Sequence, residues 1–95
     1  MRITRVRIFK TGLPYVGGAY CWGAGNAIEV AQASVVVIDT DAGLQGCGEF
    51  TPCGENYMLA HSGGVQAVAP LLVPRLLGED PRQVGRIAQI IDHTV

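Results

Sequence analysis

Three segments of the chain carry the apolar patterns that predict β-strands. Residues 2–10 alternate, with apolar side chains on one face and arginines on the other, which is typical of a half-buried antiparallel strand. Residues 33–40 are apolar on both faces and favour a central strand. Residues 44–50 follow a turn at Gly43, a residue that suits a short hairpin with a bulge. The pattern therefore predicts a three-stranded antiparallel meander.

Two helices are predicted after the strands. Apolar side chains recur at helical spacing in residues 62–72, although two prolines make the end of that helix irregular. A second helix is expected to begin with Asp80 as its N-cap and Pro81 at its first position. Its apolar stripe continues to Val95 without a stop signal, so we expect the chain to end inside a helix. The predicted class is α+β, with the meander followed by an antiparallel helical pair.

The connection over residues 11–28 has no charged side chain and contains five glycines and three aromatic residues. Connections of this length in a compact domain are usually functional or disordered, and disordered segments are normally polar. Tyrosine and tryptophan offer an apolar body with one polar tip. Two interpretations stay open, because the segment either packs on its own domain or closes as a water-excluding lid over a ligand held elsewhere.

Composition narrows the classes of function. The 95 residues are 48% apolar and only 16% charged, with a net charge of −1. This is less charge than the roughly 25% of an average soluble domain, which suggests that residues outside the chain cover part of its surface. No basic footprint favours nucleic acid, and no apolar run approaches the ~20 residues of a membrane span. Without a signal-peptide pattern, we expect a cytoplasmic protein.

Few residues combine into a recognisable catalytic or metal site. The cysteines and histidines lack the short-range pairs of zinc sites, so no metal site is expected. A nucleophilic pair of Cys53 and His61 is conceivable, but the sequence shows no group that would activate the thiol. Glu49 precedes a second connection, residues 51–57, and Glu55 lies within it, but nothing in the sequence assembles them into an acid–base pair.

Three motifs together resemble one known family. The stretch TDAGLQGCGEFTP, residues 40–52, resembles the TDxGLxGxGE hairpin of the mandelate racemase/muconate lactonizing branch of the enolase superfamily. The opening Met1–Val6 with Leu13-Pro14 is similar to the first strand of that family, and Leu77–Pro81 to its LLGxDP helix start. Their order and spacing agree over nearly the whole chain. Cys47 departs from the pattern, since many relatives carry tryptophan there, which leaves the subgroup open.

The resemblance implies that residues 1–95 are an incomplete N-terminal capping domain, normally followed by a (β/α)-barrel. That barrel would hold Mg²⁺ and use Lys or His bases to remove the proton α to a carboxylate. The implied full-length protein is a racemase, epimerase or dehydratase acting on a small carboxylate such as an amino acid, proline derivative or sugar acid. It would be a homo-oligomer. No catalytic or metal-binding residue is expected in this chain, which alone should be inactive.

The resemblance also implies two loops that close over the substrate. They map to residues 13–27 and 51–57. The residues expected to lie close to the substrate are Tyr20, Trp22, Cys53, Glu55 and Tyr57. Glu55 could pair with a cationic group of an amino-acid-like substrate. The alternative is a non-enzymatic interaction module that binds a protein partner through the uncharged aromatic connection, residues 11–28.

Overall fold

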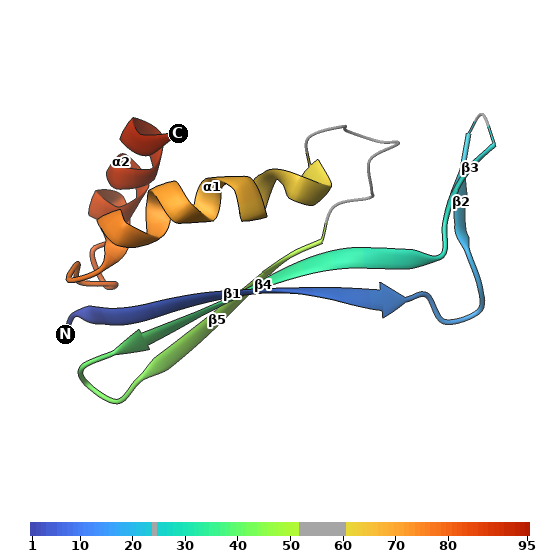
Figure 1. Ribbon diagram of the computed structural model, residues 1–95. Coiled ribbons are helices and arrows are strands. Elements are labelled where there is room, and N and C mark those ends of the chain that lie inside the picture. The colour runs from blue at the N-terminus through green and yellow to red at the C-terminus, as the bar shows by residue number, and fades with distance from the viewer. Residues whose placement is uncertain (24, 52–60) are drawn as a thin grey trace.

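A computed structural model describes residues 1–23, 25–51 and 61–95 (Figure 1). A three-stranded antiparallel sheet in the order β1-β4-β5 is joined by a separate two-stranded hairpin, β2-β3, and by two helices. The elements are β1 (Ile3–Pro14), β2 (Tyr20–Trp22), β3 (Asn26–Ile28), β4 (Val30–Thr40), β5 (Gln45–Phe50), α1 (His61–Leu76) and α2 (Val84–Thr94). The predicted α+β class is confirmed.

Strand β1 is longer than its sequence pattern predicts. Its pairing with β4 runs from Arg5 opposite Asp39 to Pro14 opposite Val30, after an irregularity between Ile3 and Arg5. The alternation ends near residue 10, but β4 begins at Val30 and supplies backbone partners for the rest of β1. Backbone pairing across the sheet therefore extends the strand where side-chain alternation no longer marks it.

The turn between β4 and β5 forms as the sequence predicts. Gly43 has a φ of 76°, in the left-handed region that glycine adopts without steric cost. The Thr40 hydroxyl donates to the Leu44 carbonyl at 2.9 Å, and the Leu44 N–H donates back to that hydroxyl at 3.2 Å. These bonds set the register in which Gln45 lies opposite Asp39.

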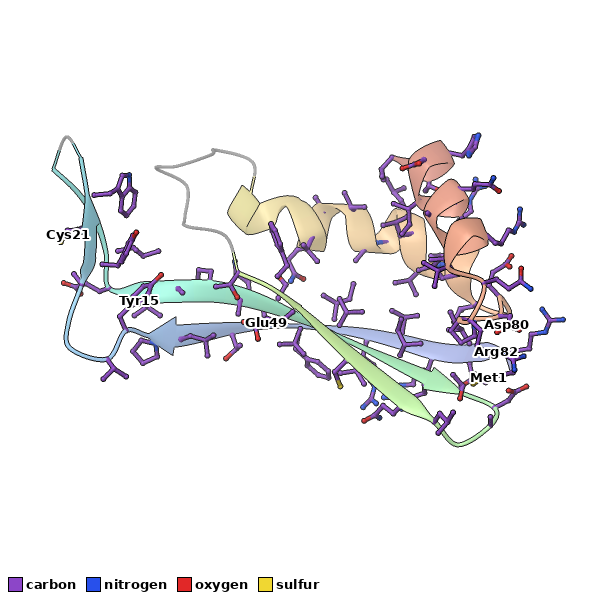
Figure 2. The ribbon with its side chains drawn as sticks, turned by 180° about the vertical axis from the view of Figure 1, so that it is seen from behind. Met1, Tyr15, Cys21, Glu49, Asp80 and Arg82 are labelled. Carbon is purple, nitrogen blue, oxygen red and sulfur yellow. The ribbon has the colours of Figure 1, made fainter. Side chains whose placement is uncertain are left out.

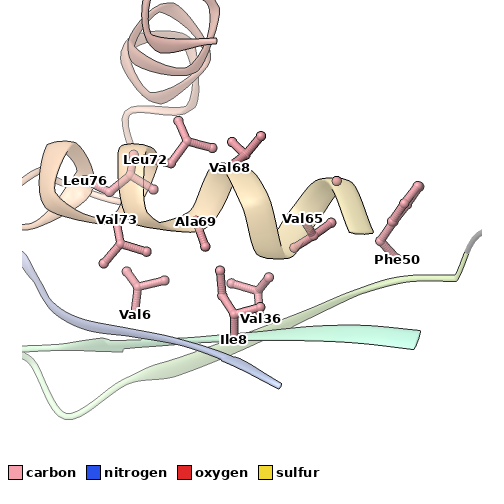
Figure 3. Close-up of a pocket in the computed structure, with 11 residues that line it drawn as sticks. Val6, Ile8, Val36, Phe50, Val65, Val68, Ala69, Leu72, Val73 and Leu76 are labelled. Carbon is pink, nitrogen blue, oxygen red and sulfur yellow. The ribbon is translucent and has the colours of Figure 1, made fainter. Parts of the chain in front are cut away.

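Both helix boundaries differ from the prediction. Helix α1 continues through Pro70 and Pro74 to Leu76. Each proline removes one backbone N–H donor, and the packing of the helix over the sheet compensates for that loss (Figure 3). Helix α2 begins at Val84 with Gln83 at the N-cap, not at Pro81. Asp80 instead closes the preceding turn. Its carbonyl accepts from the Gln83 N–H at 3.0 Å.

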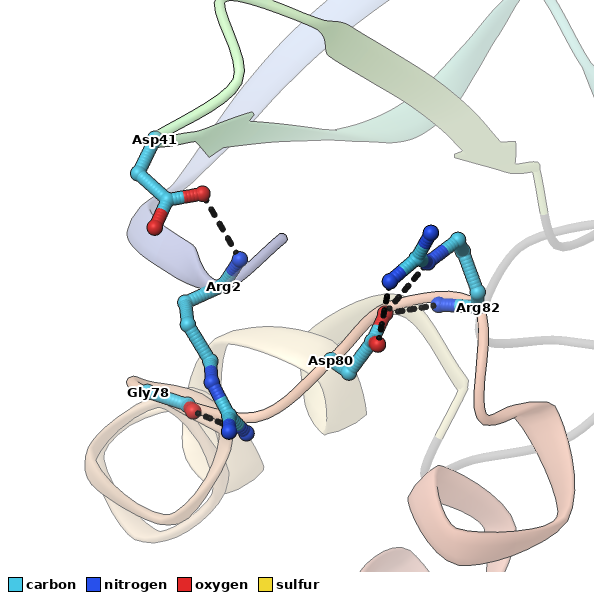
Figure 4. Close-up of polar contacts among 5 residues, drawn as sticks. All are labelled: Arg2, Asp41, Gly78, Asp80 and Arg82. Carbon is cyan, nitrogen blue, oxygen red and sulfur yellow. Dashed lines mark hydrogen bonds and ion pairs between the residues drawn. The ribbon is translucent and has the colours of Figure 1, made fainter.

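The two helices meet at a corner. Figure 1 shows α2 rising steeply from the end of α1 rather than lying alongside it. Hydrogen bonds tie the connection between the helices to the start of the chain, and Figure 4 shows those that Arg2 makes with Gly78 and Asp41. The Ile3 N–H donates to the Glu79 carbonyl at 2.8 Å, and the Gly78 N–H donates to the Ile3 carbonyl at 2.9 Å. The Arg2 side chain reaches the Gly78 carbonyl at 3.4 Å, while the Arg2 N–H donates to the Asp41 carboxylate at 2.8 Å.

Replacing Gly78 by alanine should destabilise the connection between α1 and α2. Gly78 has a φ of 84°, a conformation that costs an L-residue about 1 kcal/mol or more. We expect Gly78→Ala to lower the free energy of unfolding of the full-length protein by about that amount. Gly48→Ala is the matched control, because a Cβ at Gly48 meets no atom within 4 Å and its backbone is extended. Equal urea midpoints for the two variants would contradict this assignment.

The Asp80 carboxylate should make the stability of the domain pH-dependent. Hydrogen bonds from the side chain and N–H of Arg82 hold the pKa of Asp80 well below its ordinary value of 3.8. A lowered folded-state pKa contributes stability above the unfolded-state pKa and loses it as the pH falls through the folded-state pKa. Asp80→Asn should therefore lower the melting temperature at pH 6, and the deficit should shrink as the pH falls below about 4. A deficit of the same size at pH 6 and pH 3 would contradict the linkage.

Within the described part of the chain, the domain encloses little core of its own. The buried apolar residues are Ile3, Ala31 and Ala33, and no large side chain is fully buried. An apolar cavity of about 380 Å³ lies between α1 and the sheet (Figure 3). It is lined by Val6, Ile8, Val36, Phe50, Gly64, Val65, Val68, Ala69, Leu72, Val73 and Leu76. In the described chain, neither helix combines the length and apolarity that a membrane span requires.

Candidate functional site: an aromatic hairpin at one end of the sheet

The β2-β3 hairpin projects from the end of the sheet that lies away from the helix corner (Figure 1). Tyr20 lies opposite Ile28, and Trp22 opposite Asn26. Between β1 and β2 the chain reverses at Gly17 and Gly18, whose φ values of 88° and 104° favour glycine. The connection predicted over residues 11–28 is therefore structured, since the end of β1 and both hairpin strands lie within it.

Three rings form a continuous row on this hairpin. The centroids of Tyr15 and Tyr20 are 5.8 Å apart with 25° between the ring planes. Those of Tyr20 and Trp22 are 6.0 Å apart with 34° between the planes. These separations fall in the range of favourable aromatic pairs. We call Tyr15, Tyr20 and Trp22 the aromatic row; Cys21 alternates with its members along β2, and its thiol donates to the Ala19 carbonyl at 3.7 Å.

The aromatic row stays open to its surroundings. Tyr20 is 53% exposed, Tyr15 is 37% exposed and Trp22 is half-buried. Val16, at the turn before the glycines, is fully exposed. Residues 11–14 of this segment pair with β4, whereas the rings contact one another. The exposure of Tyr20 and Val16 favours the interpretation in which the segment covers a ligand held elsewhere. What remains is an exposed apolar surface carried by a hairpin.

Sequence reasoning placed Tyr20 and Trp22 near the substrate but missed Tyr15 as part of the same surface. The structure brings Tyr15 beside Tyr20 because the chain reverses at the two intervening glycines. The Tyr15 N–H also donates to the Glu29 carbonyl at 3.2 Å, which fixes Tyr15 at the base of the hairpin. The Gly17-Gly18 pair in the sequence was the available signal for this reversal.

The second predicted loop falls mostly outside the described residues. Cys53, Glu55 and Tyr57 lie there, so their proximity to a substrate stays a prediction, as does the pair of Cys53 with His61. At the near edge of that loop, the exposed Glu49 carboxylate accepts a hydrogen bond from the Thr51 hydroxyl at 2.6 Å (Figure 2).

Positive charge is absent from the hairpin and lies on the first part of β1 and around the helices. Residues 11–74 contain no Lys or Arg. On the sheet, Arg7 pairs with Asp39 at 3.0 Å, and the Gln45 amide donates to the same carboxylate at 2.7 Å. The hydrogen bond from Gln45, followed by the charge of Arg7, lowers the pKa of Asp39 below its usual range. Asp39 is therefore an ionised carboxylate with a structural role, and its charge is balanced by Arg7.

The described residues do not fit a magnesium site. Within residues 1–23, 25–51 and 61–95, no three His, Cys, Asp or Glu side chains come together as metal ligands would. Mg²⁺ prefers several oxygen ligands in near-octahedral geometry. The described part of the chain therefore supplies no set of ligands for Mg²⁺.

Comparison with known proteins agrees with the sequence motifs. A curated relative, cis-3-hydroxy-L-proline dehydratase from Roseibium aggregatum, is 39% identical over 92 residues, which cover 97% of this chain and 25% of the relative. The crystal structure of a mandelate racemase/muconate lactonizing enzyme from Roseovarius nubinhibens is 73% identical. It aligns with a TM-score of 0.93 over 99% of this chain and 26% of its own.

A second crystal structure, an enolase superfamily member from Roseovarius nubinhibens complexed with magnesium, is 35% identical. It aligns with a TM-score of 0.84 over 99% of this chain and 25% of its own. The chain thus spans about a quarter of the length of these relatives. The family model described as mandelate racemase / muconate lactonizing enzyme, N-terminal domain, matches residues 23–95. The chain therefore belongs to the mandelate racemase/muconate lactonizing enzyme family, as its N-terminal domain.

Proposed function

We propose that this chain is the capping and specificity domain of a Mg²⁺-dependent racemase, epimerase or dehydratase. The full-length enzyme would remove the proton α to the carboxylate of a small acid, such as an amino acid, a proline derivative or a sugar acid. The observation that carries the proposal is the exposed aromatic row, which sits on a projecting hairpin rather than in a core. A relative crystallised with magnesium and a relative named as a hydroxyproline dehydratase support it.

The contribution of this chain to the reaction is to exclude water and to hold the substrate. Tyr20 and Trp22 present apolar ring faces that can cover a ligand, while their polar tips allow a hydrogen bond. Closing a site against water strengthens every electrostatic interaction inside it. A Mg²⁺ ion held by the remainder of the polypeptide would supply electrostatic stabilisation of the negative charge that develops on the substrate. We assign the ion and the bases to the remainder of the polypeptide.

The proposal also covers the domain organisation, oligomeric state and cellular location of the enzyme. We place its catalytic centre in a C-terminal barrel domain and expect a homo-oligomer in the cytoplasm. The two cysteines in the described chain, Cys21 and Cys47, are free and exposed, which is consistent with a reducing compartment.

Exchange of the α-proton tests the proposal directly. The full-length enzyme, loaded with Mg²⁺ in D₂O, is incubated with a panel of amino acids, proline derivatives and sugar acids. Loss of the α-proton signal is followed by ¹H NMR. We expect exchange or dehydration on at least one acid and none after chelation with EDTA. A folded full-length protein that exchanges no acid in a broad panel would overturn the enzymatic proposal in favour of an interaction module.

A further inference from the structure

We infer that the face of the sheet opposite the helices is an interface with a second copy of this protein. The proposed function includes a homo-oligomer, and the inference rests on that proposal and names the surface that would form it. Six residues define this surface, which we call the open face: Arg5 and Phe9 on β1, Val35 and Val37 on β4, and Cys47 and Glu49 on β5.

Strand pairing places these six side chains on the same side of the sheet. Val36 lines the cavity beneath α1, so Val35 and Val37 on either side of it point away from that helix. Phe9 and Glu49 both lie opposite Val35, and residues directly opposite each other share a face. The other members lie two or four residues away on the same strands and share that face. Figures 1 and 2 show both helices and the β2-β3 hairpin on the other side of the sheet.

The open face exposes apolar side chains that no other described element covers. Phe9 is 49% exposed, Cys47 is exposed, and Val35 and Val37 are half-buried. An apolar centre with an aromatic residue and charges at its rim is the usual anatomy of a protein interface. The catalytic domain of the proposed function has to meet the aromatic row, which projects on the helix side. The open face is therefore left for another partner.

The charges of the open face lie at its opposite corners. β1 and β5 are the two edge strands of the sheet. Arg5 lies on β1 opposite Asp39, whereas Glu49 lies on β5 opposite Val35, nearer the other end of the face. Neither Arg5 nor Glu49 forms an ion pair with another described residue, while Arg7 is already paired with Asp39. One corner thus offers a cation and the other a carboxylate.

This arrangement makes the open face complementary to itself. A two-fold symmetric dimer uses the same patch on both protomers, so each contact between two different residues occurs twice. A two-fold axis that exchanges the corners brings Arg5 against Glu49 of the partner subunit at two places, with Phe9 and Val37 packed between them. The strands of the two sheets then cross at a steep angle, which is one of the two packing classes of sheets. A second copy already carries the charge pattern that any other partner would have to supply.

Charge reversal in the full-length protein tests this interface. Sedimentation equilibrium over a range of protein concentrations gives the molar mass and the strength of association. We expect the wild-type protein to be an oligomer. Arg5→Glu and Glu49→Arg should each weaken association by about tenfold or more, because like charges then face each other at both contacts. The double variant should recover most of the association, since the pair is re-formed with its charges exchanged.

Lys10→Glu is the matched control for these variants. It makes the same change of charge on β1, but Lys10 follows Phe9 in the strand and therefore lies on the helix side of the sheet. We expect its association to equal that of the wild-type protein. Phe9→Ser, at a half-exposed position, should weaken association without a change of charge, and it serves if a charge reversal does not fold as judged by circular dichroism.

A monomeric wild-type protein would overturn the inference, as would charge reversals that leave association unchanged or a double variant no better than the single ones. A lower melting temperature at unchanged mass would assign the open face to the rest of the same polypeptide and would also overturn it. The proposed function is judged separately by α-proton exchange. Exchange by a monomeric wild-type protein would refute only the interface, and no exchange by an oligomer that responds as expected would refute only the enzymatic proposal.

Discussion

Removing the aromatic hairpin will lower kcat/KM of the full-length enzyme by about 100-fold or more. The deletion replaces residues 15–29 by an Asn-Gly turn. It leaves the sheet intact because Pro14 already lies opposite Val30 at the end of the β1-β4 pairing. The enzyme then loses the rings that cover the substrate, so water enters and the reacting groups are less well held. Misplacement of about 1 Å alone is enough to cost roughly 100-fold in rate.

Steady-state kinetics and magnesium titration together check this result. Affinity for Mg²⁺ should stay unchanged, since the described residues of the hairpin include no metal-ligand cluster. Val16→Thr is a mild control at a fully exposed position of the same segment and should change kcat/KM little. If the deletion variant binds magnesium and turns over at the wild-type rate, the hairpin is not part of the site.

Residues 1–95 in isolation should show no turnover and an unfolding free energy below about 3 kcal/mol, under the 5–15 kcal/mol of ordinary domains. The buried apolar residues of the described chain are small or few, and α2 has no buried residue. Among the described residues, apolar side chains line a cavity between α1 and the sheet, and such a void forfeits the dispersion contacts that close packing supplies. The α-proton exchange assay measures turnover, urea unfolding followed by circular dichroism measures the unfolding free energy, and binding of the dye ANS reports exposed apolar surface.

Covering this surface should reverse the instability. The full-length protein is expected to unfold at higher urea concentration and to bind little dye, since further polypeptide then packs against the domain. A larger side chain in the cavity offers a second check. Ala69→Leu in the isolated domain should raise the urea midpoint, because Ala69 lines that cavity (Figure 3). A fragment that unfolds cooperatively with more than about 5 kcal/mol and binds no dye would contradict the expectation of an unfinished core.

Much of the sheet could be predicted because its residues alternate in a way that only one arrangement satisfies. Val6 and Ile8 point toward α1 (Figure 3). Arg7, which alternates with them along β1, pairs with Asp39. The turn at Gly43 also follows from a local rule, since its positive φ is tolerated best by glycine. The family motifs were sufficient to identify the family, and the match of its N-terminal domain model over residues 23–95 confirms that identification.

Local rules failed where two local arrangements compete or where strand pairing decides the outcome. Asp80 is a good N-cap residue, but its side chain bonds Arg82 within a turn, and the helix begins only at Val84. Strands β2 and β3 have three residues each, too few for a periodic signal, and they lie among glycines. Their pairing depends on the turn between them, which contains Gly25 with a φ of 77°.

The sequence by itself determined the family, the three main strands, the presence of two helices and the absence of positive charge from residues 11–74. These properties follow from side-chain pattern and composition, which act locally. Only the tertiary structure decided that Tyr15 joins Tyr20 and Trp22 in one exposed row, at the end of the sheet opposite the helix corner. The physical reason is that ring contacts arise from chain reversal and strand pairing, whose geometry no single segment encodes.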